Sequence, residues 1–185
     1  MSGTVSEHFA AGECKEIIGT PDARQALLAS FARLALSKLY HDFGVDCVVR
    51  AANVARSTFY YHFSTKDDLL LENLRELIAV LGITPLESSP SPELKRWIAH
   101  IWQHRSPAGR LVTGRTGEKL QSALTVELRT TMLDRCADRF NSASAALRAE
   151  QIAGSTMTLL RAWLGNRISA RPDEMAGRYG IRGTP

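Results

Sequence analysis

Residues 45–69 read VDCVVRAANVARSTFYYHFSTKDDL. This stretch predicts a short apolar helix, a tight turn, a second short helix rich in hydrogen-bonding side chains, and the start of a third helix. Val48, Val49 and Ala52 give the first helix an apolar face. Asn53 stands where the chain must reverse, and Asn tolerates left-handed backbone angles better than most residues other than Gly. Two helices joined by so short a turn commonly place a helix in the major groove of DNA.

The second short helix has one inward and one outward face. Phe59 and Phe63, four residues apart, should pack inward, with Val54 closing the corner. A β-strand over residues 57–63 is the alternative, because β-branched and aromatic residues favour strands. The stretch does not alternate strictly, however, and no hairpin partner lies nearby. The outward face is left with Arg56, Ser57, Thr58, Tyr60, Tyr61 and His62.

The third helix begins with a strong start signal. Thr65 is a good N-cap, and Asp67 and Asp68 fall in the first turn, where acidic groups suit the helix dipole. Lys66 lies beside the exposed backbone N–H groups of this helix start, a natural place to hold a phosphate. An ordinary solvated lysine is the alternative interpretation of Lys66.

Residues 20–71 resemble the N-terminal domain of the TetR family of transcriptional repressors. The resemblance begins with TPDARQALLASF at residues 20–31 and continues through TFYYHF at residues 58–63 to Lys66. Asn53 stands where the family usually has Gly. Ala55 replaces the usual Ser cap of the recognition helix, which should cost that helix about 1 kcal/mol.

The resemblance implies an all-α fold: an N-terminal three-helix DNA-binding domain with a helix-turn-helix, followed by a C-terminal helical ligand-binding and dimerisation domain. The implied partners are double-stranded operator DNA, a second copy of the chain in a homodimer, and a small apolar or aromatic effector that releases a repressor. Hydroxyl groups donate to phosphate oxygens, and Arg binds guanine edges or phosphates. The predicted DNA-binding residues are Arg24, Arg50, Arg56, Ser57, Thr58, Tyr60, Tyr61, His62 and Lys66.

Charge supports this interpretation only locally. The whole chain carries a net charge of +4, but residues 1–70 contain seven Lys and Arg against eight Asp and Glu. Between residues 49 and 64 there are Arg50 and Arg56 and no acid. Affinity for DNA should therefore come from this local surface, doubled by dimerisation.

The predicted organisation is a flexible arm over residues 1–19, the helix-turn-helix domain over 20–70, and the effector-binding and dimerisation domain over 71–185. Helices are expected near residues 22–40, 66–81, 93–104, 107–113, 117–140 and 141–166, with a short one from Pro172. The helix over 66–81 should link both domains and end at Gly82. Residues 84–92 contain three prolines and should form a loop.

The C-terminal part offers apolar faces whose partners the sequence leaves open. Small residues on the penultimate helix allow another helix to approach closely, which favours a dimer bundle, with an intramolecular core as the alternative. Trp97 and His100 could line a pocket or belong to a core helix with a solvated edge. The predicted pocket residues are Leu77, Leu81, Trp97, His100, Ile101, Leu120, Leu124 and Met157. The predicted dimer residues are Ala149, Ile152, Ala153, Leu159, Leu160 and Trp163.

Other classes of protein are not indicated. No catalytic motif, phosphate-binding Gly-rich loop or HExxH sequence is present, so we expect neither an enzyme nor a cofactor. His100 and His104 have the i, i+4 spacing of a metal pair but no further ligand at useful spacing, so no metal is expected. The alternatives to an effector-controlled regulator are control by a protein partner or, less favoured, a helical enzyme.

Export and membrane insertion are not indicated either. The chain has no apolar run of 18 or more residues and no signal-peptide pattern at its N-terminus. Cys14, Cys47 and Cys136 are odd in number and far apart, which is typical of free thiols in a reducing compartment. A cytoplasmic location is therefore expected.

Overall fold

The computed structural model describes residues 21–37, 40–87 and 89–178, and within these residues every regular element is a helix. The all-α prediction is confirmed, whereas the predicted arm over residues 1–19 lies outside the described part. Among the described helices, none has both the length and the apolar character needed to cross a lipid bilayer. The elements are α1 (Pro21–Ser37), η1 (Tyr40–Asp42), α2 (Val45–Ala52), α3 (Arg56–His62), α4 (Lys66–Asn73), α5 (Arg75–Ile83), η2 (Thr84–Leu86), α6 (Pro92–Gln103), α7 (Arg105–Leu111), α8 (Gly114–Arg135), α9 (Ser142–Leu164) and α10 (Pro172–Gly177).

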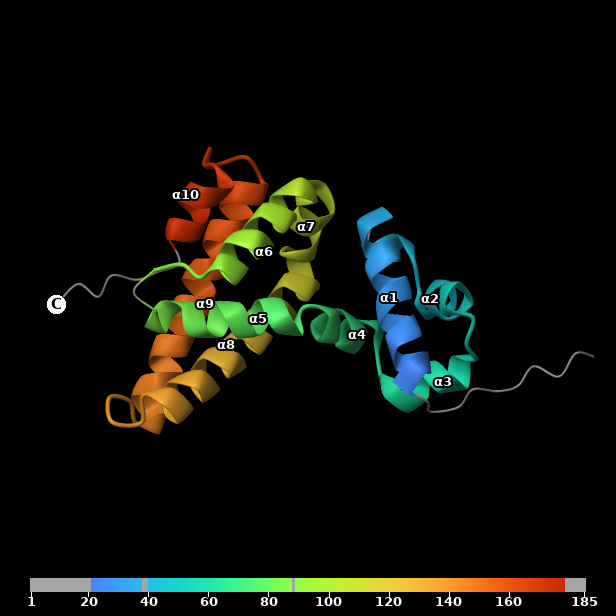
Figure 1. Cartoon of the computed structure of the whole chain (residues 1–185), viewed down its shortest axis with the longest axis horizontal. Helices are drawn as coiled ribbons and strands as arrows, with labels where there is room; N and C mark the ends of the chain where they lie inside the picture. Colours follow the sequence, from blue (N-terminus) through green and yellow to red (C-terminus); the bar gives the residue numbers. More distant parts are fainter. Residues whose placement is uncertain (1–20, 38–39, 88, 179–185) are drawn as a thin grey trace, which may run out of the picture.

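Helices α1–α4, which we call the N-terminal bundle, enclose one hydrophobic core, and Figure 1 shows α1 flanked by α2 and α3. Phe31 of α1 meets Tyr40 and Phe43 edge to face, with ring centroids 6.2 and 5.8 Å apart. Phe59 and Phe63 of α3 are both buried, as their spacing predicted. These aromatic anchors hold α3 against α1 and α2.

The turn between α2 and α3 has the predicted reversal at Asn53. This residue adopts φ 53° and ψ 47°, the left-handed region. Its N–H donates to the carbonyl of Arg50 at 3.2 Å, and the N–H of Val54 donates to that of Val49 at 3.1 Å. The pair of bonds is a Schellman motif, which satisfies the last carbonyls of α2. Ala55 then starts α3 without a side-chain cap, as expected.

Asn53 is held in the left-handed region, so replacing it with Ala or with Gly distinguishes the cost of backbone strain from the cost of losing the Asn side chain. We expect Asn53→Ala to lower the free energy of unfolding by about 1 kcal/mol, since a Cβ without a local hydrogen-bonding group is disfavoured there. Asn53→Gly should match or exceed the stability of the wild type. Urea denaturation followed by circular dichroism measures both. Equal destabilisation by Ala and Gly would show that the Asn side chain, not the backbone conformation, matters.

The predicted continuous helix over residues 66–81 is wrong, because the structure breaks it at Leu74. Leu74 adopts φ −98° and ψ 3° and separates α4 from α5. The side-chain amide of Asn73 donates to the carbonyl of Leu69 at 2.9 Å, and the N–H of Leu74 is shared between the carbonyls of Leu70 and Leu71. An Asn side chain that competes for a helix carbonyl disturbs the regular ladder. The expected end at Gly82 is also displaced, since α5 reaches Ile83 and continues into η2.

Helices α5–α10, which we call the C-terminal bundle, enclose a second core centred on the α8–α9 pair (Figure 1). Ala145, Ala149 and Ala153 are fully buried on α9 and let neighbouring helices approach closely. Gly117 of α8 also permits a close approach, because an added Cβ would lie 2.3 Å from the carbonyl oxygen of Val112.

This packing contradicts the dimer assignment of most residues on the penultimate helix. The residues that were expected to face a partner, and that are instead buried within one chain, are Ala149, Ile152, Ala153, Leu160 and Trp163. Leu159 is half-buried against the same core. The intramolecular alternative holds because α9 is the central helix of its own bundle, contacting both α8 and α7.

A polar contact joins the two bundles. Asp67, in the first turn of α4, accepts a hydrogen bond from the hydroxyl of Tyr40 and pairs with the ammonium group of Lys119 on α8. Burial opposes ionisation of Asp67, but the bonds from Lys119 and Tyr40 outweigh it and lower the pKa of the carboxyl group. Burial and the neighbouring Asp67 raise the pKa of the Tyr40 phenol. One carboxylate thus ties η1, α4 and α8 together.

The lowered pKa of Asp67 gives stability a defined dependence on pH. The unfolded chain has the ordinary value of about 3.9, so as the pH falls it takes up a proton before the folded chain does. The stabilisation is therefore complete at neutral pH and is lost as the pH falls through the folded-state pKa. We expect Asp67→Asn to be less stable than the wild type at pH 7 and to lose less on acidification. Urea midpoints between pH 7 and pH 3 test this.

Lys119→Met supplies the matching control. If the pair carries the effect, this variant should show the same loss at pH 7, and the double variant should lose little more than either single one. If the losses of stability in the two single variants instead add up in the double variant, the effect of Asp67 comes from its other contacts and not from Lys119.

Candidate nucleic-acid interface

The exposed surface of α3 carries hydrogen-bonding side chains. Tyr60 and Tyr61 are 50% and 68% exposed, which is unusual for large aromatic residues. Arg56 and Ser57 are exposed beside them. The guanidinium of Arg56 donates to the Tyr60 hydroxyl at 3.2 Å and pairs with the carboxylate of Asp46. The surface therefore presents two phenols, a hydroxyl and an oriented guanidinium to solvent.

Asp46 changes the local charge expected from the sequence. The interval from residue 49 to 64 contains no acid, but the fold brings Asp46 of α2 against Arg56 of α3. Arg50 remains exposed near the end of α2, with its Nε donating to the backbone carbonyl of Asp46 at 3.3 Å. The positive surface is thus Arg50 and a partly neutralised Arg56.

Two residues predicted on the outward face lie elsewhere. Thr58 is only 1% exposed, so its expected contact with DNA is wrong. α3 packs against both α1 and α2, and these two contacts bury Thr58 as well as Phe59. His62 is half-buried, and its Nε2 is buried without a hydrogen-bond partner. The usable outward face is therefore narrower than the sequence suggested.

Lys66 does not stand free at the start of α4, contrary to the prediction. Its ammonium group donates to the carbonyl oxygens of Tyr40 at 2.5 Å and Phe43 at 2.7 Å. It also lies 3.9 Å from the centroid of the Tyr40 ring. Burial lowers the pKa of Lys66. The lysine closes the η1 segment onto α4, because unpaired carbonyls at the end of that short turn need donors.

Arg24 is likewise engaged within the fold. Its guanidinium pairs with Glu72 of α4 at 2.6 Å and lies 5.6 Å from the centre of the Phe63 ring. The side chain is only partly exposed, so it flanks the α3 surface as a structural contact between α1 and α4. Glu72, far from Arg24 in sequence, was not identified beforehand because no local spacing connects the two.

The contacts of Lys66 predict that its loss damages folding as well as any function. Lys66→Met removes two hydrogen bonds from a charged donor, each worth about 1.5–3 kcal/mol in proteins. We expect a fall in the free energy of unfolding of at least about 1.5 kcal/mol. Lys95→Met, at an exposed position on α6, should change stability little. Thermal or urea unfolding measures both variants. Unchanged stability in Lys66→Met would show that the hydrogen bonds of Lys66 do not stabilise the fold.

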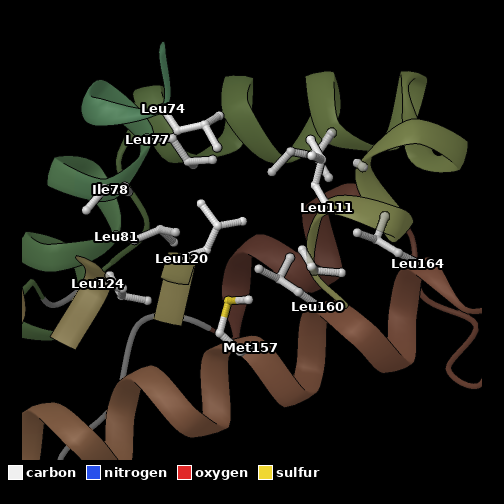
Figure 2. Close-up of a pocket in the computed structure, with 13 residues that line it drawn as sticks. Leu74, Leu77, Ile78, Leu81, Leu111, Leu120, Leu124, Met157, Leu160 and Leu164 are labelled. Carbon is white, nitrogen blue, oxygen red and sulfur yellow. The ribbon is translucent and has the colours of Figure 1, made fainter. Parts of the chain in front are cut away.

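The C-terminal bundle contains an apolar cavity of about 90 Å³. Figure 2 shows leucine side chains from α5, α7, α8 and α9 converging on it, with Met157 below. Of the predicted pocket residues, those that line this cavity are Leu77, Leu81, Ile101, Leu120, Leu124 and Met157.

Trp97 and His100 do not line this cavity, which corrects the prediction. They line a separate cavity of about 200 Å³ that also involves α1. Ile101 contributes to both cavities, because the face of α6 with Trp97 and His100 is turned toward α1. Periodicity alone could not separate two adjacent faces of one helix.

α2 and α3 are joined by a tight turn, and α3 exposes Arg, Ser and Tyr side chains. This is the arrangement of a helix-turn-helix protein. Comparison with known proteins agrees. Residues 27–72 match the family model described as bacterial regulatory proteins, tetR family. The HTH-type transcriptional regulator EthR of Mycolicibacterium smegmatis is 35% identical over 57 residues, which are 31% of this chain and 26% of that protein. The match therefore spans about a quarter of this curated relative.

Solved structures extend the likeness to most of the fold. A TetR transcriptional regulator from Rhodococcus sp. RHA1 has 18% identity and a TM-score of 0.58, over 85% of this chain and 93% of that one. The TetR family repressor AlkX from Dietzia sp. strain DQ12-45-1b has 19% identity and a TM-score of 0.53, over 86% and 91%. The N-terminal bundle therefore matches the TetR family in sequence, and the fold of the described chain resembles that of TetR-family structures.

Proposed function

We propose that this chain regulates transcription by binding double-stranded operator DNA as a homodimer, through the exposed face of α3. The observation that carries the proposal is the pairing of exposed Tyr60 and Tyr61 with buried Phe59 on one short helix. The apolar side of this helix attaches it to the core, and its polar side stays exposed to solvent, where the contact of Arg56 with Asp46 is its link to another helix. The matches to TetR-family regulators support this function.

The dimensions of α3 suit the major groove of DNA. The helix has seven residues and is therefore about 10 Å long, against a groove about 12 Å wide. Tyr and Ser hydroxyls donate to phosphate oxygens and fix the orientation of the helix. Arg56 lies at the exposed surface, where its guanidinium bonds to Asp46 and Tyr60, and it would reach a base edge by exchanging one of these partners for the base.

In a homodimer, two α3 helices related by a two-fold axis should reach successive major grooves about 34–36 Å apart, or somewhat more. Selection from random DNA with the full chain should therefore yield an imperfect palindrome. We expect Tyr61→Phe to weaken binding of all sequences about fivefold, because one hydrogen bond is lost per subunit. Arg56→Ala should instead relax base preference at one position in each half-site.

Ile168→Ala is the matched control, because Ile168 is exposed in the loop after α9 and away from α3. It should bind like the wild type. Protection of one asymmetric half-site by a monomer, or no selected sequence at all, would contradict the proposal.

Because most of the predicted dimer residues are buried within the chain, we propose instead that the dimer forms through the exposed sides of α8 and α9. Leu147 of α9 is 76% exposed and Val126 of α8 is 60% exposed. The Oγ1 of Thr125 on α8 is shielded but has no hydrogen-bond partner. Exposed apolar side chains on two adjacent long helices are suited to isologous packing against a second copy.

Leu147→Glu tests this surface. A charge buried at a two-fold interface meets its own copy, so we expect this variant to sediment as a monomer at concentrations where the wild type is dimeric. Ile168→Glu, at an exposed apolar position outside α8 and α9, should leave the dimer intact. A dimer that survives Leu147→Glu would place the interface elsewhere.

We further propose that a small apolar or aromatic effector releases the DNA. The cavity of about 90 Å³ has a wholly apolar lining, and it is smaller than the cavity of about 150 Å³ known to hold benzene. An effector must therefore displace side chains such as Leu77 and Leu81 of α5. Because α5 meets α4 at the Leu74 break, such a displacement acts on the position of the N-terminal bundle. If the bound effector favours a separation of the two α3 helices that does not match the operator half-sites, a free-energy difference of a few kcal/mol is enough to release the DNA.

A further inference from the structure

The cavity lined by Trp97 and His100 lies between the two bundles. It has a volume of about 200 Å³, twice that of the cavity inside the C-terminal bundle. Phe31 and Ala35 of α1 form one wall, and α6 and α7 form the other. Leu74, at the break between α4 and α5, contributes to both cavities and packs against both hydrophobic cores.

The lining of this inter-bundle cavity has a distinctive chemistry. It contains no Asp, Glu, Lys or Arg side chain. Its polar side chains are the amide of Asn73, which donates to the Leu69 carbonyl, and the imidazoles of His100 and His104, whose ring centroids are 4.7 Å apart. Neither imidazole hydrogen-bonds to any residue that the structure describes. Burial and the neighbouring His104 lower the pKa of His100, so His100 is neutral at neutral pH and offers both a donor and an acceptor.

We propose that the inter-bundle cavity binds a small, neutral aromatic molecule that carries a hydroxyl group. The ring would lie among Phe31, Trp97 and the surrounding aliphatic side chains, with its hydroxyl on His100 or His104. The volume exceeds that of a cavity able to hold benzene. A charged ligand is disfavoured, because no side chain of opposite charge lines the cavity to offset its desolvation.

A molecule bound in this cavity would contact both bundles. A ligand there touches α1 on one side and α6 on the other, so it favours one separation of the two bundles over others. The shared Leu74 and Leu77 also couple it to the smaller apolar cavity. An effect on DNA affinity rests on the proposed function, whereas binding of the molecule itself does not.

The test uses 2-naphthol and naphthalene as probes of the full chain, with binding followed by tryptophan fluorescence and calorimetry. Ala35→Phe fills the inter-bundle cavity, and Leu124→Phe fills the other one, since Leu124 lines only the cavity inside the C-terminal bundle. We expect Ala35→Phe to reduce 2-naphthol affinity at least about tenfold and Leu124→Phe to change it less than about twofold. Circular dichroism confirms that each variant is folded.

A second pair of measurements isolates the imidazoles. The double variant His100→Phe/His104→Phe keeps two rings but removes their polar atoms, so it should weaken 2-naphthol about fivefold and leave naphthalene nearly unchanged. Absence of 2-naphthol binding to the folded wild type, or loss of binding in Leu124→Phe but not in Ala35→Phe, would overturn the proposal. Operator affinity, measured separately without probe, reports on the proposed function independently.

Discussion

The candidate site depends on the packing of α3, a helix too short to be stable by itself. α3 has seven residues and no side-chain cap at Ala55, and isolated helices of this length are unstable in water. Its stability comes from Phe59 and Phe63, which are buried against α1 and α2. Burying one such side chain contributes about 1.5–3 kcal/mol. The orientation of Tyr60 and Tyr61 is therefore set by the core beneath them, so the core of the N-terminal bundle is part of the site.

The first turn of α4 organises what surrounds that core. Lys66 and Asp67 are neighbours in sequence but bind different segments: Lys66 holds the carbonyls of Tyr40 and Phe43, while Asp67 reaches Lys119 in the C-terminal bundle. Tyr40 takes part in both, because its ring lies beneath the Lys66 ammonium and its hydroxyl bonds to Asp67. These polar groups at the start of α4 thus fix the N-terminal bundle internally and tie it to the rest of the chain.

Local features were predictable from sequence, and tertiary ones were not. The turn at Asn53 and the inward pair Phe59 and Phe63 follow from backbone preference and spacing, which act over a few residues. Thr58 and Lys66 were misassigned because their surroundings come from α1, α2 and η1, elsewhere in the chain. The break at Leu74 depends on a side-chain bond by Asn73 that periodicity does not reveal. The apolar face of α9 was recognised, but whether a face packs within a chain or against a second copy is a property of the whole fold.

The contact of Asp67 with Lys119 has a consequence for how ionic strength acts on this protein. Both side chains are partly open to solvent, so added salt screens their attraction. Salt also weakens contacts between basic side chains and phosphates by changing the release of counterions. If the chain binds operator DNA as proposed, raising the salt concentration would weaken both the binding of DNA and the junction between the bundles. The slope of log affinity against log salt then contains a contribution from the shape of the protein and cannot be read as a simple count of phosphate contacts.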